Sequence, residues 1–207
     1  KLTQLAYSVP DSWKNVHGRK QSMLPETRVW TRDEMMKRVA LFKDLVGNKG
    51  GLPDSHLPEA EKEIFNVIGF QPPPGEGEAG GMVNSPVGAD AARNSAIRIS
   101  EGFNMGFARC RPGCGPLMHN HDTNETFMPV TGRWRCAWNE GDDYEFIDAG
   151  PCDVISFPAG VMRRFECIET PAGEETALIM FVVAGDAPAN EFSEAARARM
   201  AEVPAPA

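Results

Sequence analysis

Three residues near the middle of the chain, His119, His121 and Glu125, are spaced as ligands of a single metal ion would be. Alternate side chains of an extended strand share one face, and these three residues have the same parity. One strand can therefore direct two imidazoles and one carboxylate toward the same point. Two histidines and a carboxylate with open coordination positions form the ligand set of non-haem Fe(II) oxygenases, and Mn or Zn can also use it. The spacing predicts a divalent metal site.

The same residues belong to a longer pattern, Gly-x5-His-x-His-x3-Glu-x6-Gly. Its fixed positions are Gly113, His119, His121, Glu125 and Gly132. The pattern resembles the first signature of the cupin superfamily and matches it at every fixed position. The resemblance extends over about residues 97–183. It implies an all-β fold, a cupin-type jelly-roll β-barrel, with the three polar side chains inside it.

The second cupin signature is only partly present. Pro158 and Gly160 match it, whereas Cys152 stands where the first glycine of the signature usually is. Arg163 stands at the position of the family's last histidine ligand. Because an arginine stays protonated, it cannot act as a metal ligand at ordinary pH. The resemblance therefore implies at most three protein ligands, with a fixed positive charge beside them.

Arg163 has two possible roles. It shares the more apolar face of its predicted strand with Phe165 and Cys167, so it is expected to point inward, where a guanidinium needs a partner. In the first role it is a catalytic residue beside the metal and binds an acidic group of the substrate with its planar fork of donors. In the second role it pairs with Glu125 and leaves the metal site weak or empty. A cation at about 4 Å, with an effective dielectric constant near 20, lowers metal affinity by roughly a few kcal/mol.

These features favour a metal-dependent enzyme acting on a small, acidic or oxygenated organic molecule. The preferred enzyme class is an oxygenase, for example a non-haem metal-dependent dioxygenase. Fe(II) is the first candidate for its cofactor, and Mn, Zn or Ni are the alternatives. Cupins of similar motif include isomerases, lyases and decarboxylases, and a fold does not determine a reaction. The alternative function is a non-catalytic or metal-free cupin that binds a small anionic ligand through Arg163 and the histidines. A structural remnant without a ligand is the third hypothesis.

The elements that must position the site are predicted from periodicity and from turn residues. After residue 96, apolar residues alternate in short segments separated by Gly, Pro or Asp, which is typical of an antiparallel sandwich or barrel. Residues 97–185 are therefore expected to form the barrel. The predicted strands are 97–99, 105–110, 125–130, 133–139, 144–147, 153–157, 162–168 and 177–183.

The segments on either side of the barrel are predicted to be helical. Residues 1–96 are expected to form an arm, with one helix over 32–46 that begins at a capping box and a second over 58–68 with proline at its start. The Pro/Gly-rich segment 71–85 is expected to be a linker, with a loop over the barrel mouth as the alternative. Residues 186–207 are expected to contain a closing helix over 191–203 and a frayed tail.

Several further residues are weaker candidates. His17 and His56 lie in predicted loops from which they can reach over the barrel as extra ligands, and Tyr144 is a possible proton donor. The alternating Trp134, Cys136 and Trp138 are expected to be core or dimer packing rather than a substrate platform. Cys110 and Cys114 precede the histidines and are interpreted as buried thiols, with a second metal site or a redox pair as the alternative.

Composition limits the classes of partner. The chain has 207 residues and a formal net charge of -8, which argues against nucleic acid and anionic membranes as partners. No apolar run approaches the roughly 18 residues of a membrane-spanning helix. Five scattered cysteines do not form a typical disulfide framework, which favours a reducing, cytoplasmic location. The expected partners are a small-molecule substrate and, from the cupin resemblance, a second copy of the chain in a homodimer.

Overall fold

A computed structural model describes residues 27–69, 83–84 and 94–203 of the chain. It divides into two units, residues 1–36 and 37–207. The described part of the first unit contains the short helix α2 (Arg32–Met36). The predicted capping box is present at its start, because Thr31 Oγ1 accepts a hydrogen bond from the Glu34 amide at 3.2 Å and Glu34 Oε2 accepts one from the Thr31 amide at 2.8 Å.

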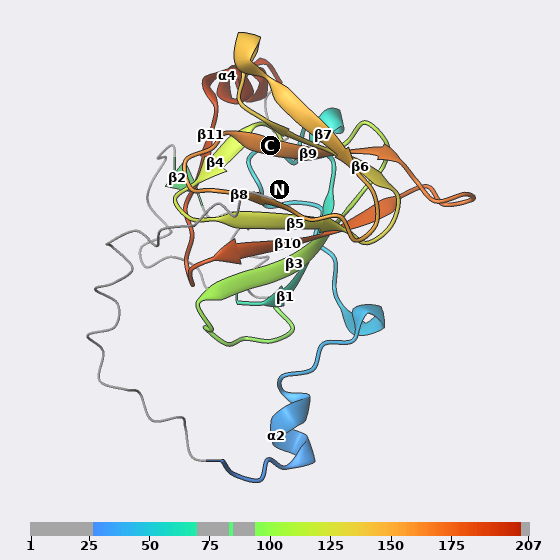
Figure 1. The fold of residues 1–207 in the computed structure, drawn as a ribbon, viewed down its shortest axis with the longest axis vertical. Helices are drawn as coiled ribbons and strands as arrows, with labels where there is room; N and C mark the ends of the chain where they lie inside the picture. The colour runs from blue at the N-terminus through green and yellow to red at the C-terminus, as the bar shows by residue number, and fades with distance from the viewer. Residues whose placement is uncertain (1–26, 70–82, 85–93, 204–207) are drawn as a thin grey trace, which may run out of the picture. The chain divides into compact units, whose positions relative to one another are not determined.

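The second unit is built around two antiparallel β-sheets (Figure 1). The strand order is β1-β3-β10-β5-β8 in the five-stranded sheet and β2-β11-β4-β9-β6-β7 in the six-stranded sheet. This arrangement confirms the predicted all-β, jelly-roll class. The strands are β1 (Glu63–Ile68), β2 (Val83–Asn84), β3 (Phe103–Cys110), β4 (His119–His121), β5 (Glu125–Pro129), β6 (Arg133–Trp138), β7 (Glu145–Ala149), β8 (Ile155–Phe157), β9 (Arg163–Glu169), β10 (Ala177–Ala184) and β11 (Asn190–Phe192).

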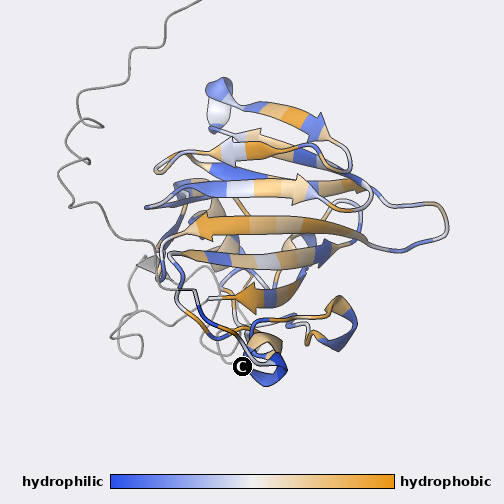
Figure 2. Ribbon diagram, turned by 60° about the horizontal axis from the view of Figure 1, so that its bottom comes forward, coloured by the Kyte–Doolittle hydropathy of each residue, from blue (hydrophilic) through white to orange (hydrophobic). Residues whose placement is uncertain are grey.

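Aromatic side chains join the inner faces of the two sheets. Buried and partly exposed residues alternate along β3 and β10, as the two-residue period of a strand requires. Phe127 of β5 packs against Phe165 of β9 with ring centroids 5.0 Å apart, and Trp134 of β6 lies 5.7 Å from Phe165. Trp134 and Cys136 are fully buried in this core, as predicted. Figure 2 shows the hydrophobic stretches on the strands, while hydrophilic residues gather on turns and short helical segments.

The predicted helix over residues 58–68 is wrong. Pro58–Ala60 form a single 3₁₀ turn (η3), and β1 then pairs antiparallel with β3. The apolar run in this segment is short, and the periodicity of so short a run does not distinguish a helix from a strand. Both faces of β1 are covered, since Ile64 belongs to the core and Phe65 packs against Phe42 with ring centroids 5.4 Å apart. The burial on both faces hides the alternation that would have identified a strand.

The predicted helix over residues 32–46 is only partly present. Helix α2 ends at Met36, and Phe42–Asp44 form a separate 3₁₀ turn (η2). Helix α2 buries no residue, and an isolated helix gains little without a packed face. Phe42 instead lies on the outer face of the five-stranded sheet, with its ring centroid 5.4 Å from that of Phe107. Tertiary contacts of this kind override a helical spacing that is only locally favourable.

The boundaries of the barrel domain also differ in part from expectation. Both β1 and β11 belong to the sheets, so the sheets extend beyond residues 97–185 at both ends. Only Ile97 of the predicted strand 97–99 pairs, in a single parallel bridge with Ile68. The closing helix α4 (Glu194–Glu202) is present, but it starts later than predicted because β11 precedes it. His17 and all but two residues of the Pro/Gly segment lie outside the described residues.

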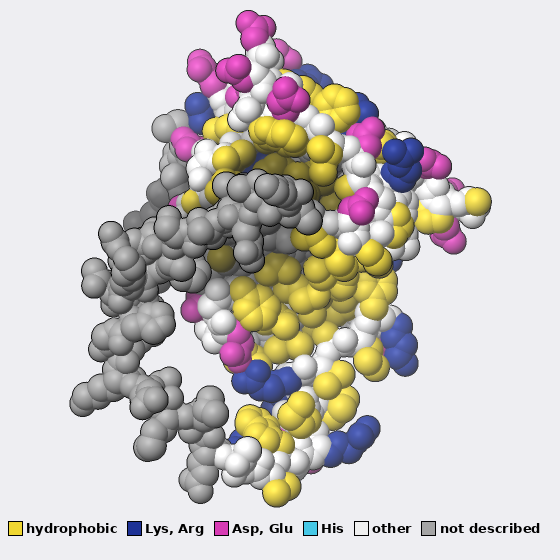
Figure 3. Space-filling view, viewed as in Figure 1, with side chains coloured by type: hydrophobic (Ala, Val, Ile, Leu, Met, Phe, Trp, Pro, Cys, Tyr) yellow, Lys and Arg dark blue, Asp and Glu magenta, His cyan; other side chains and the backbone are white. Residues whose placement is uncertain are grey.

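Side chains of two kinds, acidic and hydrophobic, form clusters on the exposed surface of the second unit (Figure 3). Acidic residues gather around the 3₁₀ turn η4 (Gly141–Asp143), and hydrophobic residues gather over the five-stranded sheet. Among the described residues, no helix combines the length and the apolar character that crossing a bilayer would require.

Cys152 stands where the cupin signature has a glycine, and its backbone has a conformation that favours glycine. Its φ is 72°, in the left-handed region where a Cβ atom is costly. We expect Cys152→Gly to raise the free energy of unfolding by about 1 kcal/mol, measured by urea denaturation. The control is Cys152→Ala, which removes the thiol but keeps the Cβ atom and should give no such gain. Equal gains in both variants would show that the thiol, not the backbone, is unfavourable.

Candidate metal centre

Two strands from different sheets carry the predicted metal ligands. His119 and His121 lie on β4 of the six-stranded sheet, and Glu125 is the first residue of β5 in the five-stranded sheet. The expectation that one continuous strand presents all three is wrong, because the chain leaves β4 after His121 and enters β5 at Glu125. The turn nevertheless brings the three side chains together, and all three are buried.

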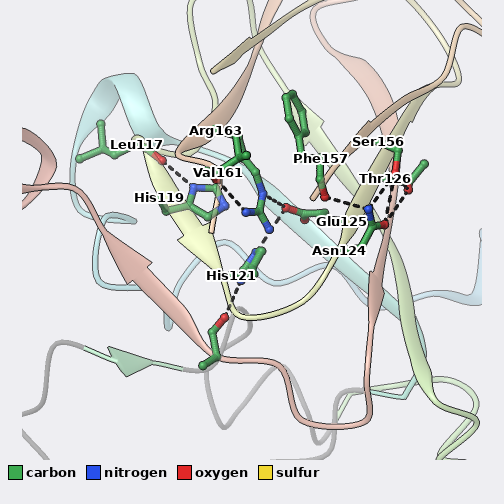
Figure 4. A network of polar contacts seen from close by, with 11 residues as sticks. Leu117, His119, His121, Asn124, Glu125, Thr126, Ser156, Phe157, Val161 and Arg163 are labelled. Atoms are coloured by element: carbon green, nitrogen blue, oxygen red, sulfur yellow. Dashed lines mark hydrogen bonds and ion pairs between the residues drawn. The ribbon is translucent and has the colours of Figure 1, made fainter. Parts of the chain in front are cut away.

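The three side chains converge closely enough to share one ion. One ligand atom from each of His119, His121 and Glu125 lies within 4.8 Å of the others. His121 Nε2 is 3.3 Å from Glu125 Oε2 (Figure 4). Ligand atoms at roughly 2.0–2.2 Å from a common Zn²⁺-like ion are themselves about 3.0–3.5 Å apart. The spacing of this pair therefore fits a bound divalent ion.

Backbone carbonyls hold both imidazole rings in place. His119 Nδ1 donates to the Leu117 carbonyl oxygen and His121 Nδ1 to the Ala189 carbonyl oxygen, each at 2.7 Å. A carbonyl oxygen can only accept, so Nδ1 carries the hydrogen in both rings. Nε2 is then the ring atom that is left for the centre in both histidines. Metal-binding histidines are commonly oriented by a carbonyl in this way.

The protonation states also suit a metal ion. Burial, together with the neighbouring His121, lowers the pKa of His119 to about 4, so its ring is neutral near pH 7. Burial acts to raise the pKa of Glu125, but His121 and the positive Arg163 outweigh it and hold this pKa at about 2. A neutral imidazole and an ionised carboxylate are the forms that coordinate a metal.

Arg163 lies inside the same cluster and is fully buried. It is the register partner of His119 across β4 and β9. Its Nε donates to Glu125 Oε2 at 3.0 Å and its Nη1 to the Val161 carbonyl oxygen at 2.9 Å. Figure 4 shows the guanidinium among the two histidines and the glutamate. The inward orientation is thus as expected, and the contact with Glu125 is the one that the second of the two roles requires.

One nitrogen of Arg163 has no partner in the part of the chain that the structure describes. Nη2 is buried and makes no hydrogen bond there. An unpaired donor of a buried cation is costly, by about 1–3 kcal/mol or more. The first role of Arg163, that of holding an acidic group, needs such a donor.

A cavity of about 50 Å³ adjoins the cluster. His119, His121 and Glu125 line it, together with the buried pair Lys62 and Asp54. This volume is enough for a few water molecules. Its apolar walls are Leu52, Ile64, Pro116, Phe165, Phe181, Val183 and Phe192.

Sequence reasoning missed Lys62 and Asp54. The signal was present, because Lys62 has the same parity as the core residue Ile64 two positions later, but the segment was interpreted as a helix. Of the weaker candidates, His56 is not part of the ligand cluster, and Tyr144 is 42% exposed.

The thiols near the histidines behave as buried side chains. Cys110 and Cys114 are both buried and free, and burial raises the pKa of each. Cys114 Sγ donates to the Pro58 carbonyl oxygen at 3.4 Å. A thiol with a raised pKa is a poor nucleophile and a poor metal ligand. These contacts support the interpretation of the two cysteines as packing residues.

No family model and no curated protein sequence matches the chain. Solved structures do match it. An oxalate oxidase is 16% identical over 44% of this chain and 46% of its own, with a TM-score of 0.39. An oxalate decarboxylase from Bacillus subtilis is 20% identical over 74% of this chain and 29% of its own, with a TM-score of 0.43. A cupin superfamily protein from Desulfitobacterium hafniense is 12% identical over 44% of this chain and 73% of its own, with a TM-score of 0.35.

These likenesses concern the fold alone. The chain spans less than half of the oxalate oxidase and under a third of the oxalate decarboxylase.

Proposed function

We propose that the protein is a metal-dependent enzyme that acts on a small, acidic or oxygenated organic molecule. His119, His121 and Glu125 would hold the ion, with Fe(II) as the first candidate and Mn, Zn or Ni as alternatives. Two imidazoles and one carboxylate with open positions suit an oxygenase best, so this is the preferred reaction. A bound divalent ion would supply a Lewis acid and, in the case of Fe(II), redox chemistry with O2.

The contact between His121 and Glu125 is the observation that carries the proposal. His121 Nδ1 donates its hydrogen to the Ala189 carbonyl oxygen, so Nε2 is the ring atom that faces Glu125. Nε2 lies 3.3 Å from Glu125 Oε2, which is an acceptor. A ring nitrogen and a carboxylate oxygen at this distance need a positive charge between them. A metal ion held by His119, His121 and Glu125 would supply that charge.

The balance of buried charge supports an acidic substrate. Arg163 pairs with Glu125 and Lys62 with Asp54, so the four formal charges cancel. A divalent ion adds two positive charges to a site of low dielectric constant, where uncompensated charge is very costly. An anionic substrate group compensates them, and the free Nη2 of Arg163 is a donor for one of its oxygens. The apolar cavity walls exclude water from the group so bound.

A metal-free protein that binds a small anion is the second candidate. The observation in its favour is the contact of Arg163 with Glu125 at 3.0 Å, because the guanidinium already neutralises the carboxylate. A proton on His121 Nε2 would then replace the metal between His121 and Glu125. The two candidates differ in whether the purified protein contains an ion.

Elemental analysis of protein purified without chelator tests the proposal. We expect about one equivalent of Fe, Mn or Zn in the wild type and at least a tenfold loss in His121→Ala, since two ligands hold an ion far less tightly than three. His56→Ala is the matched control, because His56 lies outside the cluster and its variant should keep the metal. O2 consumption by Fe(II)-loaded protein, on addition of small acids, tests the oxygenase.

The contrary result is equally clear. If the wild type contains no metal and its melting temperature does not change when Fe(II), Mn(II) or Zn(II) is added, the enzyme proposal fails. Binding of a small anion by that metal-free protein would establish the second candidate. Metal retained by His121→Ala would show that the ion is held elsewhere.

A further inference from the structure

A second buried ion pair lies on the wall of the cavity that contains the candidate ligands. Lys62 Nζ donates to Asp54 Oδ1 at 2.7 Å, and the two side chains are 3% and 1% exposed. Lys62 Nζ also donates to the Ala60 carbonyl oxygen at 3.1 Å. Both charged residues line the same cavity as His119 and Glu125. A lysine is almost never this deeply buried unless it is paired.

The lysine has one donor to spare. An ammonium group has three N–H bonds, and Asp54 and Ala60 accept two of them. In the described residues, Lys62 makes no third hydrogen bond to the protein. Because its side chain lines the cavity, an oxygen of a molecule bound there can accept the remaining hydrogen.

Stability alone is a weak explanation for this pair. Removing two charges from water costs several kcal/mol per ion, and well-packed apolar residues often stabilise such a position equally well or better. The pair stands in an otherwise largely apolar wall that includes Ile64 and Phe165. Its presence there points to a role in binding.

Asp54 also connects the pair to the candidate metal centre. Its second oxygen, Oδ2, accepts a hydrogen bond from the Leu117 amide at 3.1 Å. The carbonyl of Leu117 in turn accepts from His119 Nδ1 at 2.7 Å. A single residue of the chain thus holds Asp54 on one side and His119 on the other. The position of Lys62 relative to the ligand cluster is set by this chain of contacts.

We propose that Lys62 is a specificity-determining residue that donates a hydrogen bond to a second oxygen of the substrate, and that Asp54 is its positioning residue. The second oxygen is a hydroxyl or carbonyl rather than another carboxylate, because Asp54 already neutralises the ammonium and would repel an anion. The substrate class is therefore a small hydroxy or oxo acid. This inference rests on the proposed function, since it assumes that the acid group is held by Arg163 and the metal centre.

Matched pairs of small acids test this inference. The probes are glycolate, 3-hydroxypropionate and 4-hydroxybutyrate, each compared by calorimetry with its parent acid, acetate, propionate or butyrate. A hydrogen bond to a charged group contributes enough for about a tenfold gain in affinity. We expect wild-type protein to bind at least one hydroxy acid about ten times more tightly than its parent.

The variant for comparison is Lys62→Met/Asp54→Asn. Methionine fills nearly the same volume without a donor, and asparagine keeps an oxygen for the Leu117 amide, so the His119 loop should remain in place. Because both charges are removed together, no buried charge is left unpaired. In this variant the preference for the hydroxy acid is expected to vanish, while the affinity for the parent acid and the metal content stay as in the wild type.

Each outcome decides a different question. If no hydroxy acid binds better than its parent, or if the preference persists in the double variant, the pair is structural and the inference is overturned. Metal content, measured on the same samples, reports on the proposed function independently. A wild type that contains metal but shows no preference rejects the role of Lys62 alone, whereas a wild type without metal rejects the enzyme.

Discussion

Replacing Glu125 by leucine is expected to lower the free energy of unfolding by about 3–5 kcal/mol, because it leaves a buried cation without its partner. The guanidinium of Arg163 is 0% exposed and loses the acceptor of its Nε. One hydrogen bond, from Nη1 to the Val161 carbonyl, would then remain for a charge that water cannot reach. Urea denaturation, monitored by tryptophan fluorescence and circular dichroism, measures the loss in the free energy of unfolding.

The control for this prediction removes both charges. In Glu125→Leu/Arg163→Met, two apolar side chains replace the ion pair, and most of the lost stability should return. A double variant as unstable as the single one would show that leucine simply fits badly at this position. A single variant as stable as the wild type would mean that Arg163 leaves the cluster or finds another acceptor.

Replacing Arg163 by histidine is expected to tighten metal binding by about a thousandfold or more. Two unit charges about 4 Å apart, with an effective dielectric constant near 20, repel each other by roughly 4 kcal/mol, which corresponds to about a thousandfold, and a divalent ion carries two such charges. The substitution removes the repulsion and frees Glu125 Oε2 from the Arg163 Nε hydrogen bond. It also restores the residue type that the cupin signature has at this position. Competition with a chelator of known affinity measures the change.

A second variant separates the charge from the added ligand. Arg163→Met removes the cation without supplying an imidazole, so it should show the part of the gain that comes from repulsion alone. In both variants the affinity for small carboxylic acids should fall if Arg163 holds the acid group of the substrate. Unchanged metal affinity in both would contradict the view that Arg163 and the ion compete for Glu125.

The ligand set was predictable because it is local. His119, His121 and Glu125 lie within one short segment, and the reversal between β4 and β5 returns Glu125 to the histidines. The two-sheet class was predictable for a related reason, since alternation and turn residues repeat along the second half of the chain. Even so, the placement of the three ligands on two strands of different sheets did not follow from their parity.

The elements before the barrel were not predictable from local pattern. The run that forms β1 is buried on both faces, so it has neither the alternation of a half-exposed strand nor a long helical period. Its assignment as a strand depends on the covering side chain of Phe42 and on pairing with β3. The error concealed Lys62, because a lysine on a predicted surface helix attracts no attention as a site residue.

The amino-acid sequence alone determined the fold class and the identity of the three candidate ligands, because all three lie in one short segment and the reversal between β4 and β5 returns Glu125 to the histidines. Only the folded protein showed that Arg163 contacts Glu125, which was one of its two possible roles, and that Lys62 forms a buried pair with Asp54. Arg163 and Glu125 are 38 positions apart and belong to different sheets. Local periodicity indicates that such side chains point inward, but only the packing of the two sheets determines which buried charges meet.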